Sequence, residues 1–245
     1  MLLRLPTSVS EAQRYLAQKA VPVGGATLVW ATWQRDGFPD QALSLRHVPE
    51  ANELDRNALG AAVVLHRIDD RVPLVLHRAA ASVGTGAVRR TATVGGNLVG
   101  SALRCLLPAA LVLDARATVL EADRVHEADL GEVVAKRPLL LGLRWREPIA
   151  SAYRKLPQEA GGRPPFVVAA ALHATHGGPD RLRVAVRDGL EVLSGSVARD
   201  TDTETVLHDL RRTAIGELPP QSWEVVGEQV TALLNGRTDT PRSHP

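Results

Sequence analysis

Two double-glycine turns are the residues of this sequence whose types and spacing could do chemistry. Gly24-Gly25 follows the extended residues Val21–Val23, and Gly95-Gly96 stands 70 residues further along (95 − 25 = 70). Paired glycines let backbone N–H groups gather around a phosphate, because no Cβ atom stands in the way. Thr27 and Thr93 lie beside the two pairs and add hydroxyl donors. The pattern predicts two halves of a clamp around a pyrophosphate.

The elements that must position the first turn form a βαβ-like start of roughly 50 residues. Ser8 and Glu11 have the spacing of a capping box, which predicts a helix that begins there. A helical stretch is expected after the glycines, with Trp30 and Trp33 three residues apart. Apolar runs predict three strands in this part, at Leu2–Leu5, Val21–Val23 and Ala42–Leu45.

The rest of the chain predicts a second lobe and then a change of character. Around the second turn we expect strands at Leu59–Leu65, Ala117–Glu121 and Leu139–Trp145, and helices at Val72–Ser82 and Leu106–Asp114. After Glu147-Pro148 the sequence predicts clustered strands at Ser151–Leu156, Phe166–Thr175, Arg181–Arg187 and Leu190–Leu193, then helices at 202–214 and 221–234. Strands in a row followed by helices indicate an α+β module.

Composition narrows the function classes. The 245 residues are 44% hydrophobic, so they can bury a sizeable core, and the net charge is only +2. Basic residues are interleaved with acidic ones and aromatic residues make up 3%, which argues against a nucleic-acid partner. The single cysteine, Cys105, cannot hold an iron–sulfur or zinc site. No apolar run approaches the ~20 residues that span a bilayer, so we expect a cytoplasmic protein with no membrane partner.

The second turn and its lead-in, Val88–Leu98 (VRRTATVGGNL), resemble a family segment written V-R-N-x-A-T-I-G-G-N. That family is the FAD-binding medium subunit of the molybdenum hydroxylases, the carbon monoxide dehydrogenase and xanthine dehydrogenase group, with its PCMH-type FAD domain. Shorter segments match the family in the same order along the chain: Gly24–Leu28, Leu59–Ala61, Pro108–Ala115 and Tyr153–Lys155. The resemblance therefore extends from Val21 to about Ala171.

The resemblance implies an α+β fold. A two-lobed PCMH-type FAD-binding domain would cover residues 1–148, with lobes at about 1–56 and 57–148. A small α+β domain at 149–245, a three-stranded antiparallel sheet with helices, would follow. FAD would lie between the lobes. The implied cofactor-binding residues are Val23, Gly24, Gly25, Ala26, Thr27, Leu28, Gly60, Thr93, Val94, Gly95, Gly96, Asn97 and Lys155.

Other residues carry weaker hypotheses. Trp30 and Trp33 could line the adenine or flavin pocket, although helical spacing is more typical of core or interface packing. His173 and His176 form an H-x-x-H without a third ligand nearby, so no metal site is expected. No catalytic residue can be named, because no nucleophile elbow or Ser–His–Asp order is present.

Three functions remain open. The chain could be an oxidoreductase subunit that relays electrons from iron–sulfur and molybdopterin partner subunits to NAD or another acceptor. It could be a stand-alone flavoenzyme on a small organic, specialised-metabolite substrate. It could be a degenerate member that uses the old FAD cleft for binding or redox-neutral catalysis. Two departures keep the last two open: a short segment between Ala61 and Arg89, and Cys105 three residues before Pro108, where the family has an acidic residue that holds a cofactor hydroxyl.

Overall fold

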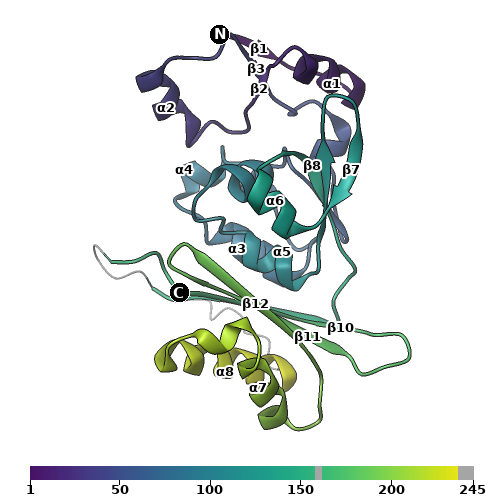
Figure 1. The fold of residues 1–245 in the computed structure, drawn as a ribbon, viewed down its shortest axis with the longest axis vertical. Helices are drawn as coiled ribbons and strands as arrows, with labels where there is room; N and C mark the ends of the chain where they lie inside the picture. The colour runs from purple at the N-terminus through teal and green to yellow at the C-terminus, as the bar shows by residue number, and fades with distance from the viewer. Residues whose placement is uncertain (158–161, 237–245) are drawn as a thin grey trace. The chain divides into compact units, whose positions relative to one another are not determined.

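A computed structural model describes residues 1–157 and 162–236 of the chain (Figure 1). These residues divide into two compact units. The first contains Met1–Val72, Leu76–Leu107 and Asp114–Arg146; the second contains Pro73–Val75, Pro108–Leu113 and the chain from Glu147 onward. Each unit has its own sheets and its own buried residues.

The first unit begins with a small parallel sheet of order β1-β3-β2, built from β1 (Leu2–Arg4), β2 (Val21–Pro22) and β3 (Gln41–Leu43). Helix α1 (Val9–Ala17) begins where predicted, because the Ser8 side chain accepts a hydrogen bond from the amide of Glu11. The Arg4 guanidinium lies 5.0 Å above the Tyr15 ring of α1, which fixes the helix beside β1. Helix α2 (Val29–Asp36) follows the first glycine turn.

A five-stranded sheet of order β4-β5-β8-β6-β7 completes the first unit, and every neighbouring pair in it is antiparallel. Its strands are β4 (Leu54–Asp55), β5 (Ala58–Gly60), β6 (Arg116–Leu120), β7 (Val125–Ala128) and β8 (Leu139–Arg144). The helices of this unit are most of α3 (Leu74–Ala81), α4 (Gly86–Arg89) and α6 (Leu130–Lys136), with the short turns η1 (Pro49–Asn52), η2 (Leu65–Arg67) and η3 (Gly96–Gly100). Apart from Leu107, α5 (Leu107–Val112) belongs to the second unit.

The second unit contains a four-stranded antiparallel sheet of order β12-β11-β10-β9. Its strands are β9 (Ala150–Lys155), β10 (Val167–His173), β11 (Arg181–Asp188) and β12 (Glu191–Ala198). Helices α7 (Thr203–Arg211) and α8 (Pro220–Leu234), with the turn η4 (Ala214–Glu217) between them, cover one face of this sheet (Figure 1). Alternate residues of β10 and β11, such as Val168 and Val184, form the buried core with Val226 and Val230 of α8.

Two expectations about strands are wrong. The C-terminal sheet has four strands rather than three, because β12 pairs with β11 along its whole length, from Asp188–Glu191 to Arg181–Ala198. Gly189, with a φ of 63°, provides the tight turn between them. The strand predicted at Leu59–Leu65 ends at Gly60, because the residues after it bond instead to the second glycine turn.

The sequence analysis also missed α4, α6 and β7, which are short. Helix α6 has a clear signal, since the Asp129 side chain accepts a hydrogen bond from the amide of Glu132. Among the described residues, no helix is both long enough and apolar enough to cross a membrane.

Candidate functional site

The first glycine turn connects β2 to α2 and lies largely open to solvent. The amide of Val23 donates to the Leu43 carbonyl oxygen at 2.8 Å, which is the last bond between this strand and β3. Ala26 then takes a left-handed conformation, with a φ of 56°. Its carbonyl oxygen accepts from the amide of Trp30 at 3.1 Å, so the helical bonding starts inside the turn. Gly24 and Thr27 are exposed.

The backbone amides of the first glycine turn are free to donate hydrogen bonds to a ligand. Across the described ranges 1–157 and 162–236, the N–H groups of Gly24, Gly25, Ala26 and Thr27 bond to no protein acceptor. Successive unpaired N–H groups around a left-handed residue form an anion-binding concavity. The start of α2 adds its partial positive charge to the same place. The first turn is therefore suited to hold a phosphate group.

The second glycine turn is the opposite in this respect. The amide of Gly95 donates to the Ala61 carbonyl oxygen at 2.9 Å, and that of Gly96 donates to the Thr93 hydroxyl at 3.2 Å. The amide of Val94 is bonded to the Val63 carbonyl oxygen at 3.0 Å. In this structure the amides of Gly95 and Gly96 therefore have acceptors within the protein. Whether they contact the cofactor in another way stays a prediction.

Asn97 fixes the chain that leaves the second turn. Its side chain is buried, and its Oδ1 accepts from the amide of Leu106 at 2.9 Å. The turn η3 is a π-helical turn over Gly96–Gly100, a geometry that is rare and common at functional sites. The amide of Ser101 donates to the Gly96 carbonyl oxygen at 3.1 Å. The loop that follows is thus tied back to the glycine turn at two points.

The two turns are in contact with each other. A Cβ atom on Gly24 would overlap the Thr93 side chain, and one on Gly25 would overlap the Thr91 carbonyl oxygen. The glycines of the first turn are therefore required by the close approach of the second. Gly60 has a similar reason, since a Cβ there would overlap the Ala51 carbonyl. Close backbone packing explains these glycines before any ligand is considered.

Arg104 is a candidate that the sequence analysis passed over. It lies in the loop after η3, has a φ of 39°, and its buried Nε atom has no hydrogen-bond partner. A non-glycine residue in the left-handed region costs free energy, and such residues gather at functional sites. Its sequence signal is weak, because Arg104 directly precedes Cys105 but belongs to none of the segments that match the family.

The aromatic residues after the first turn are not core residues. Helix α2 buries no residue, and Trp30 is 49% exposed. Both Trp30 and Trp33 meet Phe38 edge-on, with ring centroids 5.3 and 6.2 Å apart. Core packing is therefore the wrong interpretation for Trp30, and the hypotheses of a ligand pocket or an interface remain.

Lys155 belongs to the second unit. It is half-buried on β9, an edge strand of the four-stranded sheet, in register with Val167. The same sheet holds His173, whose Nε2 lies 2.8 Å from the Val112 carbonyl oxygen. In the part of the chain that the structure describes, no three His, Cys, Asp or Glu side chains gather as a metal site requires. The role of Lys155 at a flavin stays a prediction.

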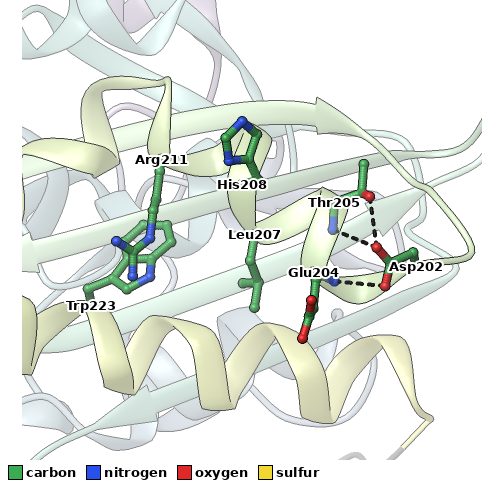
Figure 2. Close-up of a pocket in the computed structure, with 7 residues that line it drawn as sticks. All are labelled: Asp202, Glu204, Thr205, Leu207, His208, Arg211 and Trp223. Carbon is green, nitrogen blue, oxygen red and sulfur yellow. Dashed lines mark hydrogen bonds between the residues drawn. The ribbon is translucent and has the colours of Figure 1, made fainter.

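A shallow hollow lies on the helical side of the second unit, between α7 and α8 (Figure 2). Arg211 stacks over Trp223, with its guanidinium carbon 4.7 Å from the ring centroid. Asp202 caps α7 by accepting from the amides of Glu204 and Thr205 and from the Thr205 hydroxyl, as Figure 2 shows. These hydrogen bonds lower the pKa of Asp202. The hydrogen bonds of Asp202 satisfy the first amides of α7. They therefore stabilise the start of the helix and do not indicate a ligand in the hollow.

The clearest pKa shift belongs to a surface ion pair. Arg71 donates from Nε and Nη2 to the carboxylate of Asp69, at 2.8 and 2.9 Å, and lowers its pKa to about 2. The pKa of Glu11 is lowered as well, chiefly because its carboxylate accepts a hydrogen bond from the backbone N–H of Thr7. Neither carboxylate is among the predicted cofactor-binding residues, and both shifts describe local structure.

Comparison with known proteins decides the family. Residues 3–140, more than half of the chain, match the family described as the FAD binding domain in molybdopterin dehydrogenase. The chain belongs to this family. It is therefore related to FAD-dependent oxidoreductases, as the segment around Gly95-Gly96 indicated. No curated protein sequence matches the chain.

Solved structures agree on the fold. Quinoline 2-oxidoreductase from Pseudomonas putida 86 has a chain similar to this one, with a TM-score of 0.72, 19% identity and 98% of each chain covered. Reconstituted CO dehydrogenase from Oligotropha carboxidovorans gives a TM-score of 0.73 at 16% identity over 96% of each chain. The Cu,Mo-CO dehydrogenase in its cyanide-inactivated form gives 0.73 at 17%, again over 96% of each. The α+β fold of the PCMH type is confirmed.

FAD is the cofactor of this family, and the residues of this chain fit it. The four amides at 24–27 are donors without protein acceptors, the kind of group that an anionic pyrophosphate accepts from. The Thr27 hydroxyl stands beside these amides. The second turn supports the first by contact through Thr93. That these residues contact FAD stays a prediction.

Proposed function

We propose that this chain is the flavin-carrying component of an electron-transfer complex. Electrons would arrive from an iron–sulfur subunit that a molybdopterin subunit reduces, and would leave to NAD or another acceptor. FAD, when bound, supplies the redox chemistry, while the protein supplies binding and orientation. The single cysteine, Cys105, is buried and cannot ligate a cluster alone. An iron–sulfur donor would therefore belong to another chain.

The observation that carries this proposal is the run of unpaired amides at 24–27 in a chain of the FAD-binding family. Their part is to hold the pyrophosphate by hydrogen bonds, with the start of α2 adding partial positive charge. The second turn, already satisfied by its own protein bonds, holds the first in place. Neither task needs an acid or a base, as expected for a relay.

A stand-alone flavoenzyme on a small organic substrate, or a degenerate member without flavin, is the second candidate. Its support is the short segment between Ala61 and Arg89 and the replacement of an acidic family position by Cys105. In the structure, Ala61 and Val63 are used to bond the second turn. Cys105 is buried beside Leu106. A site remodelled in this way would serve a different acceptor or substrate.

The absorption spectrum of the purified protein tests these readings first. We expect a flavin band that is released as FAD on denaturation, at close to one FAD per chain. The isolated chain should oxidise NADH only slowly with an artificial acceptor, and should gain organic-substrate turnover when iron–sulfur and molybdopterin partners co-purify. Turnover of an organic substrate by the chain alone would favour the stand-alone enzyme. A protein that neither contains nor takes up flavin would contradict the relay.

Lys155 tests how far the cofactor site extends. If Lys155 contacts the flavin or a phosphate, Lys155→Ala should weaken FAD binding or shift the flavin potential while the protein stays folded. Arg154→Ala is a matched control, because the Arg154 side chain pairs with Glu228 of α8 at 2.6 Å on the helical face. Equal FAD affinity and potential in both variants would show that Lys155 is not a cofactor residue.

A further inference from the structure

The loop from Ser101 to Leu106 is held against the second glycine turn. The amide of Ser101 donates to the Gly96 carbonyl oxygen at 3.1 Å, and the amide of Leu106 donates to the Asn97 side chain at 2.9 Å. Inside the loop, the amide of Leu103 donates to the Ser101 hydroxyl at 3.2 Å. Arg104 stands between these anchors, so its position relative to the turn is fixed at both ends.

Arg104 carries three costs that the protein itself does not offset. Its φ of 39° is unfavourable for a residue with a Cβ. Its Nε is buried without an acceptor, which leaves a hydrogen bond unmade. The described part of the chain contains no ion pair to its guanidinium. Partly buried charges are normally paired, so this cation calls for an anion from outside the chain.

The first glycine turn has hydrogen-bond donors but lacks a positively charged side chain. Residues 23–28 provide N–H groups and a hydroxyl but no charged side chain. In α2 the basic residue is Arg35, and it is paired with Asp36 at 2.7 Å. A pyrophosphate carries full negative charges, which charge-assisted hydrogen bonds from arginine stabilise most strongly. A chain of contacts joins the two places, since Gly24 packs on Thr93 and Thr93 bonds the amide of Gly96.

We propose that Arg104 is the cationic ligand of the FAD pyrophosphate in this chain. The amides of Gly95 and Gly96 are used within the protein, so the second half of the clamp acts through this guanidinium instead. The left-handed backbone and the two anchors of the loop hold the arginine for that purpose. The inference deepens the proposed function, because it rests on FAD binding at the glycine turns.

The test compares FAD with riboflavin, which lacks both phosphates, in titrations of the flavin-free protein. Arg104→Gln should weaken FAD binding about 10- to 100-fold, the range of a lost charge-assisted hydrogen bond. Riboflavin affinity should not change, and the NaCl dependence of the FAD dissociation constant should become shallower. Arg104→Lys should fall between, since it keeps the charge and loses the fork. Arg90→Gln, an exposed arginine on the lead-in to the same turn, is the control and should bind FAD like the wild type.

Arg104→Gly separates this role from a structural one. Glycine relieves the left-handed strain, so its urea midpoint should equal or exceed that of the wild type while its FAD affinity falls. A lower midpoint together with weaker binding of both ligands would assign Arg104 to the fold and overturn the inference. Unchanged FAD affinity and unchanged salt dependence in Arg104→Gln would overturn it too. A wild type that binds no FAD would contradict the proposed function itself, which is a separate failure.

Discussion

The two glycine turns share a dipeptide and a neighbouring threonine, yet they are in opposite states. Gly24-Gly25 lies in an open turn, and the four amides at 24–27 have no protein acceptor. Gly95-Gly96 lies in a turn flanked by the buried residues Val94 and Asn97, and its amides are already bonded. The same sequence signal therefore accompanies unpaired amides in one turn and amides bonded within the protein in the other.

The difference comes from what lies behind each turn. In the second turn, the carbonyl oxygens of Ala61 and Val63 accept from the amides of Gly95 and Val94, and the Thr93 hydroxyl accepts from the amide of Gly96. The first turn follows β2, a two-residue strand at the edge of the three-stranded sheet, and the Val23–Leu43 bond ends the pairing with β3. Its glycines pack against the second turn, and within the described residues its amides bond to no protein acceptor. Under the proposed function, the first turn would bind the phosphate and the second would support it.

Gly25→Ala should have the largest effect on this arrangement. The new methyl group would overlap the Thr91 carbonyl oxygen, which belongs to the backbone and cannot rotate away. We expect a loss of about 3 kcal/mol in the free energy of unfolding, at the upper end of over-packing costs. FAD affinity should fall with it, because the turns must part. Urea unfolding and flavin titration measure the two effects.

Gly95→Ala is the matched substitution in the second turn. Its methyl group would stand 3.1 Å from the Cβ of Ala61, a tight contact that small shifts relieve. We expect a smaller loss of stability than for Gly25→Ala. A larger one would contradict the view that the closest approach is between the turns. Because Gly95 packs on protein, loss of flavin on substitution there does not by itself indicate a phosphate contact.

Asn97→Ala should lower the free energy of unfolding by less than Gly25→Ala does. It removes the acceptor of the buried Leu106 amide, and an unsatisfied buried N–H group costs about 2 kcal/mol. It also releases one anchor of the loop that carries Arg104, so FAD affinity should fall as well. Asn97→Asp keeps the accepting oxygen and should retain more stability than Asn97→Ala. Equal unfolding midpoints for the two variants would show that the hydrogen bond contributes nothing.

The two threonines give the sharpest contrast between the turns. Thr93→Val removes the acceptor of the Gly96 amide and should cost about 1 kcal/mol of stability. Thr27 is exposed, so Thr27→Val should leave the unfolding midpoint unchanged and weaken FAD binding instead. The contrast between the turns would be wrong if Thr27→Val lowered stability as much as Thr93→Val. It would also be wrong if Thr27→Val left the FAD affinity unchanged.

Local patterns were enough to predict much of the fold. Apolar runs and caps gave α1, α5, α8 and most strands within a few residues, because each has a strong local signal such as the Ser8 cap. The family resemblance of Val88–Leu98 predicts FAD and the PCMH-type fold, and the family match confirms both. The order of the motifs along the chain also supports the family resemblance, and this order can be read directly from the sequence.

The states of the two turns could not be predicted in this way. Which amides are free depends on residues 61–63 turning away from their strand to accept them, and this is a long-range contact. Arg104 was missed for a similar reason, since its positive φ and unsatisfied Nε exist only once the loop is anchored at Asn97. Sequence shows donors and acceptors but does not show which of them are already paired.

Trp30→Ala should have the smallest effect of these substitutions. The ring is 49% exposed on a helix that buries no residue, so its loss should change the free energy of unfolding by less than about 0.5 kcal/mol. Trp145 is the matched control: it is 6% exposed and its Nε1 donates to the Arg56 carbonyl oxygen at 3.1 Å. Trp145→Ala should cost about 3–5 kcal/mol. Equal losses in urea unfolding would mean that α2 is packed into the first unit, and the openness of the first turn would then be wrong.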